Sequence, residues 1–202
     1  YGLFEAREAM RQSGEAILVE GYFDVLRCVE AGVENAVAPC GTALTDEQAR
    51  TIRRYANTVI VVFDGDEAGI RAALRSVGVL AAAGLTVRAT SLPDGLDPDD
   101  FIRKHGAETF KQQLQNASGF VSFYANANET RLGSIKGRTQ VATELFDVIR
   151  VLDDPLRQDE YVKLVANEIG LDEFRCRASY RDFIEGLQHR ANMEQAAPPS
   201  SD

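Results

Sequence analysis

The sequence has few of the residues that build disulfide frameworks or zinc sites. Its 202 residues include three cysteines and two histidines. Cys28, Cys40 and Cys176 lie far apart and form no C-x-x-C pair, which argues against a disulfide-stapled fold or a zinc cluster and fits a reducing cytosol. His105 and His189 have no neighbour at a metal-binding spacing. We therefore expect the thiols to be packed as small apolar groups.

The sequence also lacks a long apolar run and an excess of basic residues. No stretch of eighteen apolar residues occurs, and Tyr1-Gly2-Leu3 is unlike a secretory leader, so we expect no membrane segment. Lys and Arg number 22 against 31 Asp and Glu, a net charge of -9. Because affinity for polyphosphate normally comes from Lys and Arg, binding of nucleic acid would need metal ions or a basic neighbour. The missing initiator methionine indicates a piece of a longer protein.

What is present is an alternation of strand-like and helix-like segments. The predicted strands are 16–20, 36–38, 58–63 and 86–91. The predicted helices are 3–12, 22–32, 46–56, one that ends near Gly84 and one that follows Asp97. Such alternation is typical of right-handed βαβ units and a parallel sheet covered on both faces. The fold class expected over about residues 14–115 is therefore an α/β sandwich.

The second half of the sequence contains no strand-like run. Residues 141–152 and 161–169 each show the apolar spacing of an amphipathic helix. The tail ANMEQAAPPSSD is polar and contains Pro and Ser, as disordered linkers do. We therefore expect three parts: a domain over 1–115, an all-helical subdomain over 116–190 and a disordered linker over 191–202.

Acidic residues follow three of the predicted strands. They are Glu20, Asp64, Asp66, Asp97 and Asp99. In open parallel sheets, functional sites lie beyond the carboxyl ends of the strands, so these residues are expected at one edge. Two carboxylates about 4 Å apart repel by roughly 4 kcal/mol at an effective dielectric of 20, which favours a bound cation. Oxygen-only ligands favour Mg²⁺ or Mn²⁺, and such sites are suited to phosphoryl transfer.

Each acidic residue also has a purely structural interpretation. Acidic residues at loop ends are commonly solvated. Asp97 before Pro98 has the position of a helix N-cap, and Asp24 lies in the first turn of a predicted helix, where negative charge suits the helix dipole. Taken one by one these explanations suffice, whereas the convergence of the acidic residues favours a site.

Four motifs carry a resemblance to a known family. They are EGYFDV (20–25), CGTALT (40–45), VVFDGDEAG (61–69) and LPDGLDPDDFI (92–102). In order and spacing they resemble the Toprim domain of bacterial DnaG-type primases. The resemblance covers about residues 1–115, and the helical stretch after it is similar to the helical end of the primase core.

The resemblance implies a primase, a template-directed RNA polymerase that makes RNA primers for DNA replication by nucleotidyl transfer. Glu20 matches the motif glutamate, which is implied to act as metal ligand or general acid/base, and Asp24 matches the aspartate of the same motif. The implied metal ligands are Glu20, Asp64, Asp66, Asp97 and Asp99. The implied reaction is attack of a primer 3′-hydroxyl on the α-phosphate of a nucleoside triphosphate, with release of pyrophosphate.

The resemblance also implies cofactors and partners. Two or more Mg²⁺ or Mn²⁺ ions are expected, with zinc only in an N-terminal module that is missing here. The expected partners are a single-stranded DNA template, nucleoside triphosphates and the RNA primer, with the replicative helicase bound through a missing C-terminal domain. The expected location is the bacterial cytoplasm. Without the family's basic lobe, the chain is expected to be weakly active or inactive alone.

Three alternatives stay open on the residues alone. Another Toprim enzyme, a nuclease or topoisomerase, would share the acidic motifs. A phosphatase of the haloacid dehalogenase type would use Asp64 as a nucleophile and Asp66 as an acid, although Glu67-Ala68-Gly69 departs from that family's motif and Glu20 would have no role. A non-catalytic module would only bind a cation at the acidic edge.

Overall fold

The computed structural model describes residues 1–64 and 67–196. For residues 64, 67–69, 71–73, 191 and 194–196 it describes the backbone alone. The chain forms two compact units, Tyr1–Asn128 and Glu129–Asp202, and each is described by itself.

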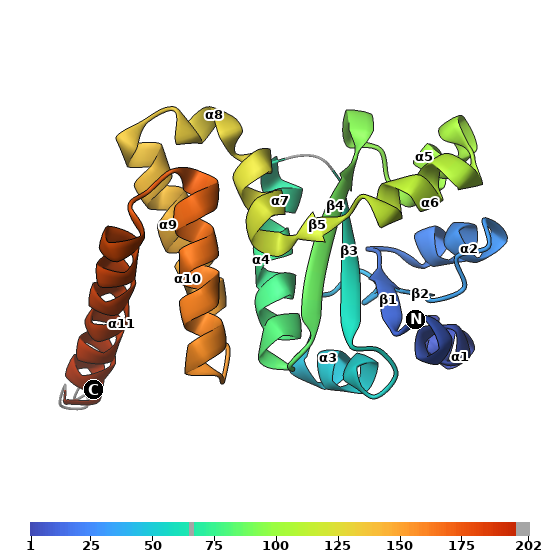
Figure 1. Ribbon diagram of the computed structural model, residues 1–202. Coiled ribbons are helices and arrows are strands. Elements are labelled where there is room, and N and C mark those ends of the chain that lie inside the picture. Colours follow the sequence, from blue (N-terminus) through green and yellow to red (C-terminus); the bar gives the residue numbers. More distant parts are fainter. Residues whose placement is uncertain (65–66, 197–202) are drawn as a thin grey trace, which may run out of the picture. The chain divides into compact units, whose positions relative to one another are not determined.

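The first unit is built on a five-stranded sheet of order β2-β1-β3-β4-β5 (Figure 1). The strands are β1 (Glu15–Leu18), β2 (Ala36–Val37), β3 (Thr58–Asp64), β4 (Thr86–Leu92) and β5 (Ser118–Gly119). The first four pair in parallel, whereas β5 pairs antiparallel with β4. The predicted α/β class with a parallel sheet is confirmed.

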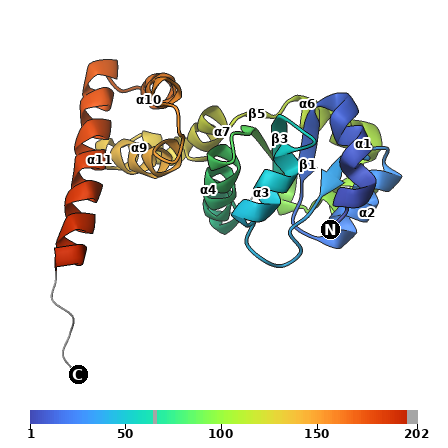
Figure 2. The same ribbon diagram turned by 90° about the horizontal axis from the view of Figure 1, so that it is seen from below.

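Helices cover both faces of this sheet (Figure 2). They are α1 (Leu3–Ser13), α2 (Tyr22–Glu30), α3 (Asp46–Arg53), α4 (Glu67–Ala82), α5 (Pro98–His105), α6 (Ala107–Gln115) and α7 (Phe120–Ala127). Alternate strand residues point to opposite faces, so Ile60 packs in the cluster under α2, α5 and α6, while the ring of Phe63 meets Phe123 of α7 at 5.8 Å.

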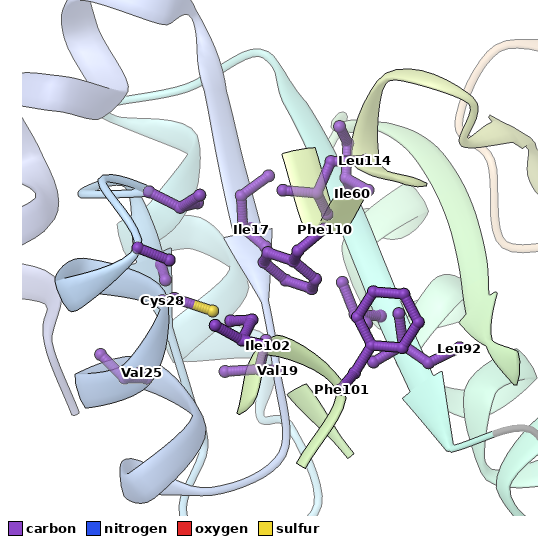
Figure 3. Close-up of a cluster of buried hydrophobic side chains, with 14 of the residues drawn as sticks. Ile17, Val19, Val25, Cys28, Ile60, Leu92, Phe101, Ile102, Phe110 and Leu114 are labelled. Atoms are coloured by element: carbon purple, nitrogen blue, oxygen red, sulfur yellow. The ribbon is translucent and has the colours of Figure 1, made fainter. Parts of the chain in front are cut away.

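The core on the first of these faces joins distant parts of the sequence (Figure 3). Val25 and Cys28 of α2 pack with Phe101 and Ile102 of α5, and Phe110 of α6 is fully buried among them. Removal of this apolar surface from water is the main force that holds the helices on the sheet.

Local sequence signals set several helix ends. The Thr45 hydroxyl accepts a hydrogen bond from the Gln48 backbone N–H at 3.2 Å, and the Gln48 side chain accepts one from the Thr45 N–H at 3.0 Å. This capping box begins α3 at Asp46, where the predicted helix 46–56 also starts. Gly14 ends α1 in the left-handed conformation with φ 72°, which glycine adopts without strain.

The second unit is helical. It consists of α8 (Glu129–Leu132), α9 (Ile135–Ile149), α10 (Pro155–Ile169) and α11 (Glu173–Ala196). The predicted apolar stripes are confirmed, because Val141 and Leu145 of α9 and Val165 and Ile169 of α10 are all buried. Asp154 caps α10 by accepting a hydrogen bond from the Leu156 N–H at 2.9 Å.

Two predicted boundaries differ from the structure. The compact units divide between Asn128 and Glu129 rather than after residue 115, because β5 extends the sheet and α7 packs on β4. Helix α11 continues to Ala196, so residues 191–196 are helical instead of disordered, and residues 197–202 lie outside the described part. Of the helices in that part, none has the length and apolar character that crossing a membrane requires.

Candidate functional site

The backbone brings the three acidic segments to one edge of the sheet. Leu18 at the end of β1 pairs in register with Val61 of β3, and Asp64 at the end of β3 pairs with Leu92 at the end of β4. Glu20 follows β1 by two residues and Asp97 follows β4 by five. Since these strands are parallel, their carboxyl ends lie together, as the sequence predicted.

Glu20 lies in the turn between β1 and α2, and Asp24 lies in the first turn of α2. Glu20 is exposed, whereas Asp24 is only 7% exposed. The Asp24 carboxylate accepts a hydrogen bond from the Gly21 N–H at 2.9 Å, so it fixes the backbone directly after Glu20. A Cβ on Gly21 would lie 3.1 Å from Asp24 Oδ2, so this close approach favours glycine at position 21.

Asp97 is the N-cap of α5. Its carboxylate accepts a hydrogen bond from the Asp100 N–H at 2.7 Å, and Pro98 begins the helix. This arrangement matches the structural interpretation of Asp97. A carboxylate has two oxygens and about four lone-pair sites, so the cap leaves acceptor capacity for a cation.

Asp99 is engaged by basic side chains. Its Oδ1 accepts a hydrogen bond from Arg27 Nε at 2.6 Å, and its Oδ2 lies 3.8 Å from Arg103 Nη1. Arg27 also donates from Nη1 to Glu30 at 2.8 Å. The hydrogen bond to Asp99 raises the pKa of Arg27 above its usual value. Sequence reasoning missed Arg27 because no local pattern marks a partner 72 positions away.

A cavity of about 580 Å³ borders this edge, and Glu20, Thr42 and Arg75 are among the residues that line it. One wall is the segment that follows β2, where Cys40 and Gly41 both have positive φ, 58° and 73°. A non-glycine residue in this conformation stores strain, and such strain is concentrated at functional sites. Thr42 donates its hydroxyl to the Pro39 carbonyl at 3.0 Å, which helps to hold the turn.

A divalent metal fits the donor chemistry of this edge. Glu20 and Asp97 offer carboxylate oxygens, the donors that Mg²⁺ and Mn²⁺ prefer. The side chain of Asp64 and all of Asp66 lie outside the described residues. Among the side chains that the structure does describe, no group of three or more His, Cys, Asp or Glu is close enough to hold a metal. The metal assignments therefore remain predictions.

Cys28 lies on α2, one helical turn after Asp24, and it is buried. Burial raises the pKa of its thiol to about 12, and the nearby Asp24 carboxylate adds to the shift. The thiol is therefore neutral at ordinary pH, as expected for a packed cysteine and unlike a nucleophile.

Two family models match the chain. One, described as Toprim-like, matches residues 17–102, and the other, described as the DnaB-helicase binding domain of primase, matches residues 127–173. The second match lies in the helical stretch after the Toprim-like part, whereas from the sequence we expected helicase binding through a missing C-terminal domain. Most of its span falls in α8, α9 and α10.

Curated relatives are DNA primases. The protein from Halalkalibacterium halodurans is 42% identical over 175 residues, which cover 85% of this chain and 29% of the relative. The protein from Listeria innocua is 36% identical over 203 residues, with coverage of 98% and 32%. The chain thus spans about a third or less of the length of these relatives.

Solved primase structures share the fold. The Aquifex aeolicus primase, with zinc-binding and RNA polymerase domains, has a TM-score of 0.74 at 31% identity, covering 86% of this chain and 41% of that one. A DnaG catalytic domain bound to single-stranded DNA has a TM-score of 0.71 at 30% identity, covering 87% and 57%. Neither the phosphatase alternative nor the other Toprim enzymes gain support from these relatives.

Proposed function

The chain belongs to the bacterial DnaG-type primase family, and from this premise we propose that it supplies the metal-binding catalytic edge for synthesis of RNA primers on a DNA template. The observation that carries the proposal is the register of β1, β3 and β4, whose carboxyl ends bring Glu20, Asp64 and Asp97 to the same edge. The reaction is nucleotidyl transfer, in which a primer 3′-hydroxyl attacks the α-phosphate of a nucleoside triphosphate and pyrophosphate leaves.

The acidic residues have different roles in the proposed reaction. Asp64, Asp66 and Asp97 supply oxygen ligands, and Glu20 acts as a further ligand or as general acid/base. Two or more Mg²⁺ or Mn²⁺ ions, when bound, neutralise charge on the attacking and leaving oxygens. Asp24 is buried and bonded to the Gly21 N–H, so we assign it the role of holding the Glu20 turn rather than contact with substrate.

The template, the nucleoside triphosphates and the RNA primer need positive charge that this chain does not supply. Its net charge of -9 opposes binding to phosphates. In the proposed function, metal ions and further segments of the protein provide that charge. One solved relative is described as bound to single-stranded DNA, which supports such a template. The match at residues 127–173 supports the second unit as a contact for the replicative helicase. The proposed location of the protein is the bacterial cytoplasm.

The function is tested by a chimera in which this chain replaces the matching segment of the Aquifex aeolicus primase. We expect the chimera to make primers and its Asp66→Asn variant to lose at least about a hundredfold of that activity, because a metal ligand is removed. The 202 residues alone should give weak or no synthesis. A chimera that folds and binds template, yet works equally well when it carries Asp66→Asn, would refute the assignment.

The metal set is tested by manganese soaked into crystals of the protein. Anomalous peaks are expected among Glu20, Asp64 and Asp66. Treatment with beryllium fluoride separates the phosphatase alternative, since a stable adduct on Asp64 would indicate an aspartyl-phosphate enzyme.

A further inference from the structure

Helices α2 and α5 each begin at the acidic edge and are joined by one ion pair. Glu20 directly precedes the N-cap of α2, and Asp97 is the N-cap of α5. Arg27 of α2 bonds Asp99 of α5 through Nε at 2.6 Å. The pair therefore connects the two segments that carry Glu20 and Asp97.

The geometry of Arg27 explains why this pair is well defined. The guanidinium donates to Asp99 along one edge and to Glu30 along another, at 2.6 and 2.8 Å. A planar group with fixed donor directions can bridge two carboxylates in this way, which a lysine ammonium does less precisely. Both side chains of the Arg27–Asp99 pair are partly shielded, with 35% and 26% exposure.

Apolar packing also holds the two helices together. Val25 and Cys28 of α2 already pack against Phe101 and Ile102 of α5 in the buried cluster (Figure 3). Apolar packing of this kind brings the helices into contact, whereas a charge-assisted hydrogen bond fixes their register through directed donors. The ion pair can thus set position without carrying much of the stability.

We infer that Asp99 is a positioning residue and not a metal ligand: with Arg27 it fixes the first turn of α5 relative to α2 and so holds Asp97 at the sheet edge where Glu20 also lies. This inference rests on the proposed metal edge and removes Asp99 from the ligands that the sequence predicted. The Asp99 carboxylate already has a strong cationic partner in Arg27, and a divalent ion would have to displace that partner.

The test measures Mn²⁺ affinity by electron paramagnetic resonance in Arg27→Gln, Asp99→Asn, the double variant and the charge swap Arg27→Asp/Asp99→Arg. Loss of residues that orient metal ligands typically costs about tenfold or more in affinity, so each single variant should weaken binding about tenfold. The double variant should be no weaker than either single one, because both remove the same interaction. The swap should recover much of the affinity, and Arg27→Lys should lose only part of it.

A direct ligand would behave differently. If Asp99 bound the metal, Asp99→Asn would weaken binding while Arg27→Gln left it unchanged or stronger, and the swap would rescue nothing. That result would overturn the inference. Lys104→Gln is the matched control. It removes a cation from α5, the helix that carries Asp99, and the partner of Lys104 is exposed Asp94 at 3.3 Å. This variant should leave Mn²⁺ affinity unchanged.

A second readout needs no metal. The Asp100 amide donates to Asp97 at 2.7 Å, so its hydrogen-exchange rate in metal-free protein reports the position of the Asp97 side chain. Arg27→Gln should raise this rate several-fold and Lys104→Gln should not. An unchanged rate in Arg27→Gln would contradict the positioning role. If the unmodified protein bound no Mn²⁺, the proposed function would fail. The exchange rate of the Asp100 amide would still decide whether the Arg27–Asp99 pair positions Asp97.

Discussion

The two compact units differ in where their acidic residues gather. In Glu129–Asp202, several acids pair with arginines: Arg131 holds Glu144 through two hydrogen bonds of 3.0 and 2.9 Å, and Arg177 pairs with Glu173 and Asp159. Tyr1–Asn128 also contains such ion pairs, but three of its segments that carry acidic residues meet at one sheet edge. The proposed metal ions would compensate the negative charge at that edge.

The cores differ in a similar way. The first unit buries residues from β1, β3, β4, α2, α5 and α6 in one cluster, so contacts between distant parts of the sequence define it. The second unit packs α9, α10 and α11, which follow one another along the chain. The candidate site is also assembled from distant segments, and it lies on the first unit.

The largest expected effect comes from breaking the first core. Phe110→Ala should lower the free energy of unfolding by about 3–5 kcal/mol, since it leaves a cavity at a fully buried side chain. Phe174→Ala in the second unit is the matched control, because Phe174 is 76% exposed, and it should change stability by less than about 0.5 kcal/mol. Urea denaturation measures both, and equal losses would contradict the assignment of Phe110 to the core.

A smaller effect is expected from one helix cap in each unit. Thr45→Ala removes the cap of α3, and Asp154→Ala removes the cap of α10. Each should cost about 1 kcal/mol, since a backbone N–H at a helix start loses its acceptor. Thermal unfolding of the two variants checks this, and a cost in one unit alone would show that local capping acts differently in the two.

The smallest effect is a dependence of stability on alkaline pH. Burial raises the pKa of Cys28 in the first unit to about 12 and that of Cys176 in the second to about 11, from 9.0. Because the unfolded thiols lose their protons first, stability is full below pH 9 and falls as the pH rises toward these values.

Between about pH 8.5 and about pH 9.5 each thiol should contribute a loss of about 0.7 kcal/mol. Cys28→Ala and Cys176→Ala should each flatten the fall, as urea titrations at several pH values would detect. An unchanged slope in either variant would mean that its thiol is accessible to water in the folded protein.

Local signals in the sequence predicted much of the first unit. The capping box at Thr45, the Asp97-Pro98 helix start and the terminating Gly14 act within a few residues, and the helices that they bound lie close to the predicted ranges. The strand β5 was missed because Ser118–Gly119 is too short to show periodicity. The unit boundary lies beyond residue 115 because β5 pairs with β4 and helix α7 packs on β4.

The location of the candidate site could be predicted from the sequence, but the ion pairs and hydrogen bonds of its residues could not. Strand order and parallel pairing follow from alternating elements, so the shared edge could be inferred. The bond between Arg27 and Asp99 joins positions 72 apart, and no rule of spacing finds such a partner. The same holds for Asp24, whose burial depends on how α2 packs.

The measurement that tests the central claim most directly is Mn²⁺ binding by Asp64→Asn beside Asp94→Asn. Both variants replace an acid with its amide near the end of a strand, but Asp94 is exposed and pairs with Lys104. The account predicts that Asp64→Asn weakens Mn²⁺ binding at least about tenfold and that Asp94→Asn leaves it unchanged. Equal affinity in the two variants would contradict a shared metal at this edge.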